Sequence, residues 1–386
     1  MSYFLTEEQI MMKDVAANFA RNELMPIAAQ IDHDEETPAW VMQRCAELGF
    51  LGVRIPEEYG GIGADITTAC IILEEVAKAS PSFAGLLSVQ AVLCPDAVLL
   101  HGNEEQKRRL LPGSATGERL LAYSQTEPSG CGNLLAHQTR LTPDGNGYRL
   151  NGHKLFCTQG HATTYLVMCR TKKDGVDGYG CVIVEGDAPG FQVQKYEDKL
   201  GWRGTNTGPI AFDDVAIAPE DILGDMLTAV LDVWPVNQLS FLGHSATSLG
   251  ALEGMFEQTV AYIKDRELYG EPMYKLSPIK DRLGQIAAKI EACRCLLYSC
   301  TRLVDEGASP VPHGSVCKAF ICDTAFECIN QLLQFWGGGG MMNSTAINRY
   351  MRDARVNMIA EGSTEIHHAA IAEGLGFTSA FAKTGN

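Results

Sequence analysis

The sequence lacks the features that would place the protein in a membrane or on nucleic acid. It has no run of about 18 consecutive apolar residues, and residues 1–8 have neither the basic segment nor the long apolar segment of a secretory signal peptide. Positive charge is scarce, since 31 Lys and Arg residues stand against 47 Asp and Glu residues, for a net charge of −16. The densest basic stretch, residues 107–109, follows two glutamates and is typical of a charged helix face. We therefore expect a cytoplasmic protein that binds neither membrane nor nucleic acid.

Paired cysteines are also missing. The 13 cysteines, an odd number, include no Cys-x-x-Cys pair, which argues against a disulfide framework and against a zinc site. The closest two, Cys293 and Cys295, would point to different faces of a helix, and the adjacent His367 and His368 cannot both face one point. We predict reduced thiols and no bound metal.

Several widespread catalytic motifs are absent as well. The chain has no P-loop, no Gly-x-Gly-x-x-Gly that opens a βαβ unit, no His-Glu-x-x-His and no Gly-x-Ser-x-Gly. A nucleotide cofactor, if one is bound, has to be held in another way.

The patterns that are present divide the chain into three parts. Its 386 residues suffice for two or three domains of about 100–200 residues each. Helix-start signals, such as Asn103 and the pair Thr37-Pro38, mark the first part, and short apolar runs between turns mark the second. The third part has apolar side chains at helical spacing. We predict an N-terminal α-helical domain over residues 1–121, a middle antiparallel β domain over 122–224 and a C-terminal helical bundle over 225–386.

Two glycine-containing loops have a backbone that a ligand could approach closely. Residues 126–132 form a compact loop where helical patterns give way to strands, and residues 337–340 are four successive glycines after an aromatic pair. The first loop suits a planar or anionic ligand and the second a phosphate or pyrophosphate. A plain loop and a flexible helix connection are the alternatives. Residues 266–272 end a long helix with an arginine, an aromatic residue and a Gly then Pro stop signal, which is also how an ordinary helix C-terminus ends.

Glu361 is the candidate catalytic group. It lies between apolar residues and Gly362, just before a helix that we expect to be capped by Ser363 or Thr364. A carboxyl group in apolar surroundings has a raised pKa. We therefore expect a raised pKa for Glu361, and such a value would suit a general base near neutral pH.

These segments resemble the acyl-CoA dehydrogenase family, in the same order and spacing and over essentially the whole chain. The similar segments are residues 55–61 (IPEEYGG), 103–112 (NEEQKRRLLP), 126–132 (TEPSGCG), 150–160 (LNGHKLFCTQG), 199–204 (KLGWRG), 266–272 (RELYGEP), 334–340 (QFWGGGG), 351–354 (MRDA) and 361–363 (EGS). The resemblance implies a mainly α fold with an N-terminal helical domain, a middle antiparallel β domain and a C-terminal four-helix bundle. It also implies a homotetramer with FAD as the cofactor.

The resemblance also assigns roles to residues. It implies that Glu361 removes the α-proton of an acyl-CoA thioester while a β-hydrogen leaves as hydride to the flavin. The thioester carbonyl would accept hydrogen bonds from the backbone N–H of Glu361 and from the flavin ribityl chain, which stabilise the developing enolate. A branch of the family places its base near residues 240–243, where this chain has no carboxylate. The implied FAD-binding residues are Tyr123, Gln125, Thr126, Gly132, Phe156, Thr158, Arg266, Tyr269, Gln334, Gly338, Ser363 and Glu365. Of these, Arg266, Tyr269, Gln334 and Gly338 would contact the dinucleotide partly from a neighbouring subunit. The implied substrate-binding residues are Gly132, Phe241, Ala360 and Gly362.

Departures from the family pattern concern the substrate more than the reaction. Ala360 stands where a tyrosine is usual beside the base, which should enlarge the pocket near the α and β carbons and favour an aromatic, cyclic or branched acyl group. Gly132 replaces a serine that contacts the pantetheine arm, and Phe241 replaces an arginine. Ser277 and Glu373 replace a glutamine and an arginine. Because these changes affect positions near CoA and the cofactor, a carrier-protein thioester is an alternative to acyl-CoA.

The sequence thus predicts an FAD-dependent acyl-CoA dehydrogenase that passes electrons to an electron-transfer flavoprotein. Three alternatives stay open. The same site could run in reverse as an enoyl-CoA reductase, it could pass electrons to oxygen as an acyl-CoA oxidase, or the chain could be a catalytically silent flavoprotein subunit.

Overall fold

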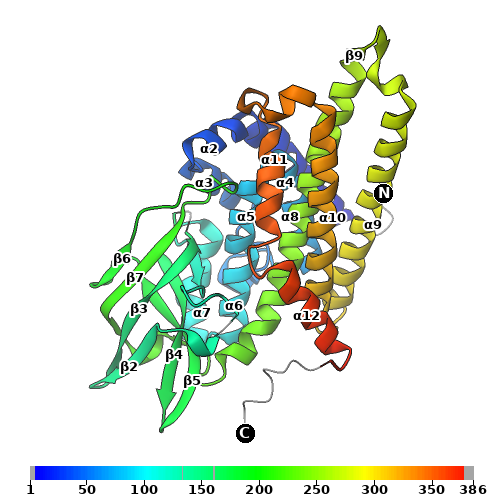
Figure 1. The fold of residues 1–386 in the computed structure, drawn as a ribbon. Coiled ribbons are helices and arrows are strands. Elements are labelled where there is room, and N and C mark those ends of the chain that lie inside the picture. Colours follow the sequence, from blue (N-terminus) through cyan, green and yellow to red (C-terminus); the bar gives the residue numbers. More distant parts are fainter. Residues whose placement is uncertain (1–4, 133, 160, 378–386) are drawn as a thin grey trace.

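The computed structural model describes residues 5–132, 134–159 and 161–377, so Gly160 and the first and last residues considered above lie outside it. Helices, then a sheet, then helices again follow one another along the chain (Figure 1). The N-terminal helices are α1 (Glu7–Phe19), α2 (Ala28–Asp34), α3 (Ala39–Glu47), α4 (Ile66–Ala79), α5 (Pro81–Ser88), α6 (Cys94–His101) and α7 (Glu104–Thr116).

Short polar side chains begin four of these helices, Thr6 at α1, Asp65 at α4, Ser80 at α5 and Asn103 at α7. Asn103 accepts a hydrogen bond from the backbone of Gln106, whose side chain bonds back to the backbone of Asn103, so the predicted cap of α7 is a full capping box. Asp65 caps α4 in the same position. The expected cap at Thr37 is wrong, because the Thr37 hydroxyl donates instead to the carbonyl of Gly204, 2.8 Å away, and Pro38 occupies the cap position of α3. Thr37 thus ties the N-terminal helices to a distant loop.

A continuous helical stretch, Pro81–His101, contains α5, α6 and a π-helical segment, Val89–Leu93, between them. By length and mean hydropathy, 1.8, it is the one stretch in the described helices that could cross a membrane, although the sequence has no unbroken apolar run there. In this structure 89% of its apolar window is buried inside the molecule. Such burial is what the core helix of a compact domain shows.

The strands form one eight-stranded sheet. Its path is β6-β7-β3-β2-β4-β5-β8, with β1 beside β4. The prediction of a purely antiparallel domain is wrong in one detail, because β1 and β2 run parallel to β4. The chain enters the sheet from α7 through β1, and this entry places β1 alongside β4 without a hairpin between them. The strands are β1 (Leu121–Ser124), β2 (Arg140–Asp144), β3 (Gly147–Thr158), β4 (Thr164–Lys173), β5 (Val176–Glu185), β6 (Phe191–Val193), β7 (Thr207–Ile217) and β8 (Ile222–Leu223).

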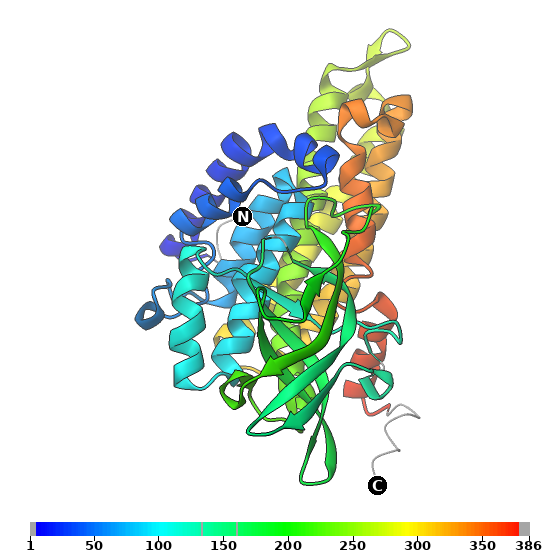
Figure 2. The same cartoon turned by 90° about the vertical axis from the view of Figure 1, so that its left-hand side faces the viewer.

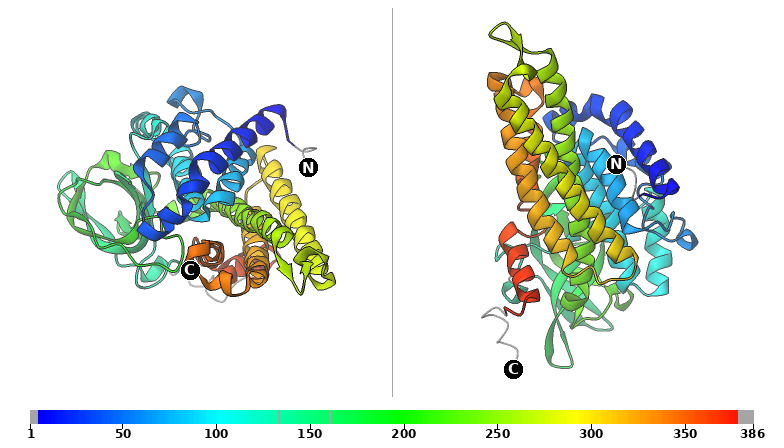
Figure 3. Two further views of the ribbon diagram at one scale, coloured as in Figure 1. Left: turned by 90° about the horizontal axis from the view of Figure 1, so that it is seen from above. Right: turned by 90° about the vertical axis from the view of Figure 1, so that its right-hand side faces the viewer.

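Long helices make up the C-terminal part. The three long ones are α8 (Ala229–Asp265), α9 (Ser277–Asp305) and α10 (His313–Phe335). Two shorter helices follow them, α11 (Asn348–Asn357) and α12 (Thr364–Gly374). A small hairpin, β9 (Glu267–Leu268) and β10 (Glu271–Pro272), joins α8 to α9 at the end of the bundle away from the sheet (Figure 1). Figure 2 shows the sheet in front of the helices, and the view from above places the sheet and α9 on opposite sides of the molecule (Figure 3).

The two helical parts share one apolar core. Phe19 of α1 and Leu73 of α4 belong to the same buried cluster as Leu249 of α8, Leu297 of α9 and Ile321 of α10. A second cluster joins α6 and α7 to strands β1, β4 and β5. The helix α8 is therefore fixed on both sides, which makes it a rigid wall for any site at its surface.

Two glycines let α8 approach α4 unusually closely. A Cβ built on Gly250 would lie 2.0 Å from the carbonyl oxygen of Glu74, and one built on Gly254 would lie 2.3 Å from that of Lys78. Because backbone atoms block both positions, no flexible side chain can move to relieve the overlap.

We expect Gly250→Ala to lower the free energy of unfolding by about 2 kcal/mol or more, since overpacking outweighs the gain in helix propensity. Gly284→Ala in α9 is the matched control. No atom lies within 4 Å of its added Cβ, so alanine there should raise stability by about 0.5–1 kcal/mol. Chemical denaturation of both variants measures the two changes, and equal effects of the two substitutions would contradict the close contact.

Candidate active site

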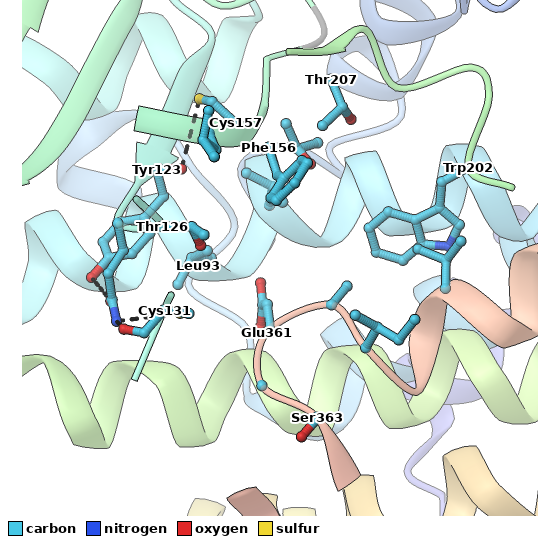
Figure 4. A pocket seen from close by; sticks show the side chains of 18 of the residues that line it. Leu93, Tyr123, Thr126, Cys131, Phe156, Cys157, Trp202, Thr207, Glu361 and Ser363 are labelled. Carbon is cyan, nitrogen blue, oxygen red and sulfur yellow. Dashed lines mark hydrogen bonds between the residues drawn. The ribbon is translucent and has the colours of Figure 1, made fainter. Parts of the chain in front are cut away.

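A cavity of about 700 Å³ lies between the sheet, α8 and the loop that joins α11 to α12. Strands β1 and β3 contribute one side, the loop of residues 197–202 another and the segment of residues 356–363 a third. Figure 4 shows Glu361 reaching from the α11–α12 loop toward Phe156, with Trp202 to one side and Tyr123, Thr126 and Cys131 to the other. The Glu361 carboxylate thus lies among apolar and small polar side chains, and the other charged groups of the wall, Glu197, Asp198 and Lys199, come from the 197–202 loop.

The backbone at Glu361 is strained, and Lys318 of the neighbouring helix α10 holds it in place by hydrogen bonds. Glu361 has φ +55° and Gly362 has φ +94°, both in the left-handed region. The fully buried Lys318 of α10 donates hydrogen bonds to the carbonyls of Asn357, at 3.2 Å, and Gly362, at 2.9 Å. Lys318 therefore fixes both ends of the loop and leaves the Glu361 side chain pointing into the cavity.

The carboxylate has two partners on α8, one helical turn apart. The Ser240 hydroxyl donates to Oε2 at 2.6 Å, and Nε2 of the buried His244 lies 2.9 Å from Oε1. The His244 contact has an ion-pair distance, but it lies off the axis of a hydrogen bond. The Glu361 side chain is 19% exposed, and this exposed part faces the cavity.

The expected raised pKa of Glu361 is wrong. Burial by itself raises the pKa, but the contact with His244, the hydrogen bond from Ser240 and the charge of Lys318 outweigh it, so the pKa of Glu361 lies below its usual value. The sequence shows the apolar neighbours along the chain, whereas the partners come from α8 and α10. Glu361 is consequently ionised at neutral pH, as a proton acceptor must be.

A third group supports His244 from the side of the cavity. The Trp202 ring stacks on the His244 ring, with centroids 5.3 Å apart and an interplanar angle of 14°. Trp202 is in turn held by Asp353 of α11, whose carboxylate accepts its backbone N–H at 2.6 Å. Gly201 makes this approach possible, because a Cβ there would lie 2.4 Å from the carbonyl of Arg352. The segments KLGWRG and MRDA therefore meet behind the base.

The loop of residues 126–132 is anchored by a buried ion pair. Lys154 of β3 contacts Glu127 at 2.7 Å, and both side chains are essentially inaccessible. Glu127 also accepts the backbone N–H groups of Gln138 and Thr139. Burial raises the pKa of Glu127, but the hydrogen bonds from Lys154 and the Gln138 backbone lower it to about 2.

Phe156 forms an exposed apolar face on the cavity. It has φ +54° and is 62% exposed, although it lies within β3, a strand that is otherwise half-buried. An aromatic side chain held open in a strained backbone, beside a glycine-containing loop, fits a planar ring system that would cover it. The donor set around it is polar and uncharged, with Gln125, Thr126 and Thr158 on the same wall.

The structure brings together most of the residues selected from the sequence. The cavity wall contains Tyr123, Gln125, Thr126, Gly132, Phe156, Thr158, Phe241, Ala360, Glu361, Gly362 and Ser363. Outside the wall are Arg266, Tyr269, Gln334, Gly338 and Glu365. Arg266 and Tyr269 belong to the β9–β10 connection at the opposite end of the bundle from α12 (Figure 1). Their roles in binding stay predictions.

Sequence analysis missed the partners of the base. It considered residues 240–243 only as a place for a carboxylate, and it gave no role to His244, Lys318 or Trp202. A signal was available, because Ser240, His244 and Ser248 are polar and repeat at every fourth position of a helix that is mostly buried. Buried polar side chains at one spacing need partners, but the pattern does not say which distant residues supply them.

The chain belongs to the acyl-CoA dehydrogenase family of oxidoreductases. The descriptions "Acyl-CoA dehydrogenase, N-terminal domain", "middle domain" and "C-terminal domain" match residues 6–118, 122–215 and 241–376. An acyl-CoA dehydrogenase of Bacillus subtilis is 32% identical over 96% of this chain and 98% of its own length. A 3-(aryl)acrylate reductase of Clostridium sporogenes is also 32% identical, over 96% of this chain and 99% of its own. The solved butyryl-CoA dehydrogenase of Megasphaera elsdenii superimposes with a TM-score of 0.93 at 30% identity, over 97% of this chain and 100% of that one. The three-domain fold expected from the sequence is thereby confirmed.

We expect Lys154→Met to lower the free energy of unfolding by about 3–5 kcal/mol at pH 7, because it leaves the buried Glu127 carboxylate without its counter-charge. Because the pKa of Glu127 is lowered in the folded protein, its ionised carboxylate stabilises the fold at any pH above the ordinary pKa of a glutamate. This contribution is lost as the pH falls toward 2. The destabilisation should therefore shrink as the pH falls from 7 toward 3, since Glu127 can then be protonated in the variant.

Arg149→Met is the control for that experiment. Its partner Asp144 is an exposed residue, 54% accessible, and the loss should stay below about 1 kcal/mol. Urea denaturation at pH 7, 5 and 3 separates the two cases. A Lys154→Met effect as small and as flat with pH as that of Arg149→Met would show that the buried pair does not stabilise the loop.

Proposed function

We propose that the protein is an FAD-dependent acyl-CoA dehydrogenase that converts an acyl-CoA thioester with a bulky acyl group to its 2-enoyl-CoA. The observation that carries this proposal is the ionised carboxylate of Glu361, which is held by α8 and α10 and faces a cavity next to the exposed aromatic ring of Phe156. Membership of the family supports the reaction. The partners that keep Glu361 ionised support the transfer of a proton from the substrate to Glu361.

The cavity wall fits FAD. Bound there, FAD would accept the hydride that leaves the β-carbon of the substrate. Phe156 would cover one face of the ring system, while Tyr123, Gln125, Thr126 and Thr158 would donate to or accept from its polar edge. The Lys154–Glu127 pair keeps the 126–132 loop in place for this contact.

Glu361 performs the proton chemistry. Its ionised carboxylate takes the α-proton as a general base, and Lys318 keeps the loop from withdrawing it. The backbone N–H of Glu361 would donate to the thioester carbonyl, where negative charge develops. A filled cavity excludes water, so both interactions act at low dielectric.

The substrate pocket favours a bulky, apolar acyl group. Ala360 leaves space beside the base. Gly132 leaves space where the resemblance places the pantetheine arm, since the nearest atom to a Cβ on Gly132 is 3.7 Å away. Phe241 places an aromatic edge against His367, with ring centroids 4.5 Å apart, where the family resemblance would place an arginine. An apolar wall here selects for hydrocarbon or aromatic groups.

The partners follow from the same assignment. We infer a homotetramer in the cytoplasm, with an electron-transfer flavoprotein as the electron acceptor. Tyr269 is 97% exposed and lies far from its own cavity, as does Arg266, which suits residues that contact the dinucleotide of a neighbouring subunit.

An enoyl-CoA reductase is the second candidate. It is favoured by the Clostridium sporogenes relative, which is named as a reductase and is as similar to this chain as the Bacillus subtilis dehydrogenase. In that direction Glu361 would donate the α-proton and FAD would supply the hydride. The electron donor supplied in the assay distinguishes the two directions.

We expect anaerobic addition of aromatic, cyclic or branched acyl-CoAs to bleach the flavin of the purified protein, and Glu361→Gln to slow this by roughly 10²–10⁴-fold, the usual contribution of a general base. Flavin absorbance measures bleaching and flavin content together. A Glu361→Gln protein with full FAD and unchanged bleaching would overturn the catalytic assignment. Bleaching only by straight short chains would overturn the substrate class.

We expect Ala360→Tyr to disfavour bulky acyl groups over butyryl-CoA by about 10–200-fold in the rate of bleaching, the range that pocket size alone provides. Gly132→Ser is the control, because we place Gly132 near the pantetheine arm that all substrates share, so it should change all of them alike. Equal effects of Ala360→Tyr on bulky and short chains would show that residue 360 does not contact the acyl group.

A further inference from the structure

His244 is the one buried histidine among the described residues that contacts the Glu361 carboxylate. Its side chain is inaccessible, its Nε2 lies 2.9 Å from Oε1 but off the axis of a hydrogen bond, and its Nδ1 has no hydrogen-bond partner within the described structure. The position is on the rigid wall of α8, one turn from Ser240. The ring cannot turn freely, because it is stacked on Trp202, whose backbone is held by Asp353.

Leaving a ring nitrogen buried and unpaired is costly. A substitution by an apolar side chain would remove that cost, whereas the histidine keeps a nitrogen at the carboxylate. The arrangement therefore makes sense if the contact with Glu361 has a function. Ser240 and His244 hold one oxygen each, which fixes the plane of the carboxylate.

We propose that His244 is a positioning residue of the base, which together with Ser240 orients the Glu361 carboxylate and sets the pH range in which it accepts a proton. This inference rests on the proposed function, because it assumes that Glu361 takes the α-proton. It assigns to His244 no contact with the substrate.

The other titratable groups around Glu361 leave this role to His244 and Lys318. From α12, His367 has its pKa lowered to about 3, chiefly by burial, and is uncharged at working pH. From α6 and the 126–132 loop, burial raises the pKa of the Cys94 and Cys131 thiols, so they are uncharged too. From α10, Lys318 is directed at two carbonyls. Among the residues described, the side chains that make a hydrogen bond or an ion pair with the carboxylate oxygens are Ser240 and His244. The charged side chains of the 197–202 loop, Glu197, Asp198 and Lys199, line the same cavity but form no ion pair with Glu361 in the described structure.

The consequence for pH follows directly. Without His244, burial and the remaining partners determine the pKa of Glu361, and burial acts to raise it. A higher pKa means that Glu361 is protonated over a wider acid range, and a protonated carboxyl cannot accept the α-proton. The acid limb of the rate profile should therefore move to higher pH, while the rate at high pH is retained.

Proton transfer can be measured apart from the redox step. In phenylthioacetyl-CoA, sulfur replaces the β-carbon, so no hydride can leave, and the exchange of its α-hydrogens with D₂O reports only the base. The FAD-loaded protein is incubated with this thioester at pH 4–10, and the exchange is followed by mass spectrometry.

We expect His244→Phe, which keeps a ring on Trp202, to move the acid limb of the exchange profile about one pH unit higher, which is a tenfold loss of rate on the steep part of that limb, and to equal the wild type at pH 9. His244→Gln, which restores an uncharged donor, should fall between the two. Ser248→Ala is the matched control, since Ser248 lies one turn further along the same face and bonds Asn357 but not Glu361, and it should leave the acid limb in place.

The possible failures are distinguishable. If Glu361→Gln still exchanges the α-hydrogens, or the wild type does not, the proposed function fails and the inference with it. If Glu361→Gln is inactive but His244→Phe lowers the rate equally at every pH, only the inference is overturned, because that is how a structural role behaves. Urea denaturation of the FAD-free protein gives a second readout. A double-mutant cycle of His244→Phe and Glu361→Gln should show coupling at pH 8 that weakens only as the pH falls below the ordinary pKa of a glutamate, and absence of coupling at pH 8 would likewise contradict the contact.

Discussion

A carboxylate that faces a closed cavity has to be stabilised by the protein, and much of this structure serves that requirement. An isolated buried charge is costly enough that the group would otherwise take up a proton. Glu361 avoids this through Ser240 and His244 on α8 and the charge of Lys318 on α10. Because these helices belong to the shared apolar core, the partners cannot move away when the cavity is empty or filled. The position of α8 against α4, which Gly250 and Gly254 permit, is therefore part of the active-site geometry.

The side of the cavity formed by the sheet follows the same principle with a different pair. Glu127 and Lys154 are both inaccessible, and each compensates the other inside the protein. A buried pair adds little net stability over an apolar pair, but removing one partner is strongly unfavourable. Its effect is to define a single arrangement of the loop between β1 and β2. The two walls of the cavity are thus fixed by two separate charged clusters, one on helices and one on strands.

The layout of the fold could be predicted from the sequence, whereas the partners of the base could not. Helix-start signals such as Asn103, strand-forming runs and amphipathic helices are local, and each predicts its own element. The motif segments brought Glu361, Phe156 and the 126–132 loop to one cavity in the structure. The shift in the pKa of Glu361 was predicted in the wrong direction, because the neighbours of Glu361 in the chain are apolar while its neighbours in space are not. The predictions of antiparallel pairing throughout the sheet and of a helix cap at Thr37 failed for the same reason, because the parallel pairing of β1 with β4 and the hydroxyl contact of Thr37 both depend on segments distant in the chain.

The lowered pKa of Glu361 changes where the catalytic power must come from. Each unit by which the pKa of a base falls removes about 1.4 kcal/mol of proton affinity, so in the proposed reaction Glu361 would take the α-proton less readily than an unperturbed carboxylate would. The gain is that it is ionised without needing a high pH. The energy of the transition state must then be lowered at the other end of the transferred charge, by donors that stabilise the enolate oxygen. A carbonyl polarised in this way makes the α-hydrogen more acidic, so a weak base that is already ionised is strong enough to accept this proton. Such a division places the demand for precision on the backbone at Glu361, whose left-handed conformation is held by Lys318 through the Gly362 carbonyl.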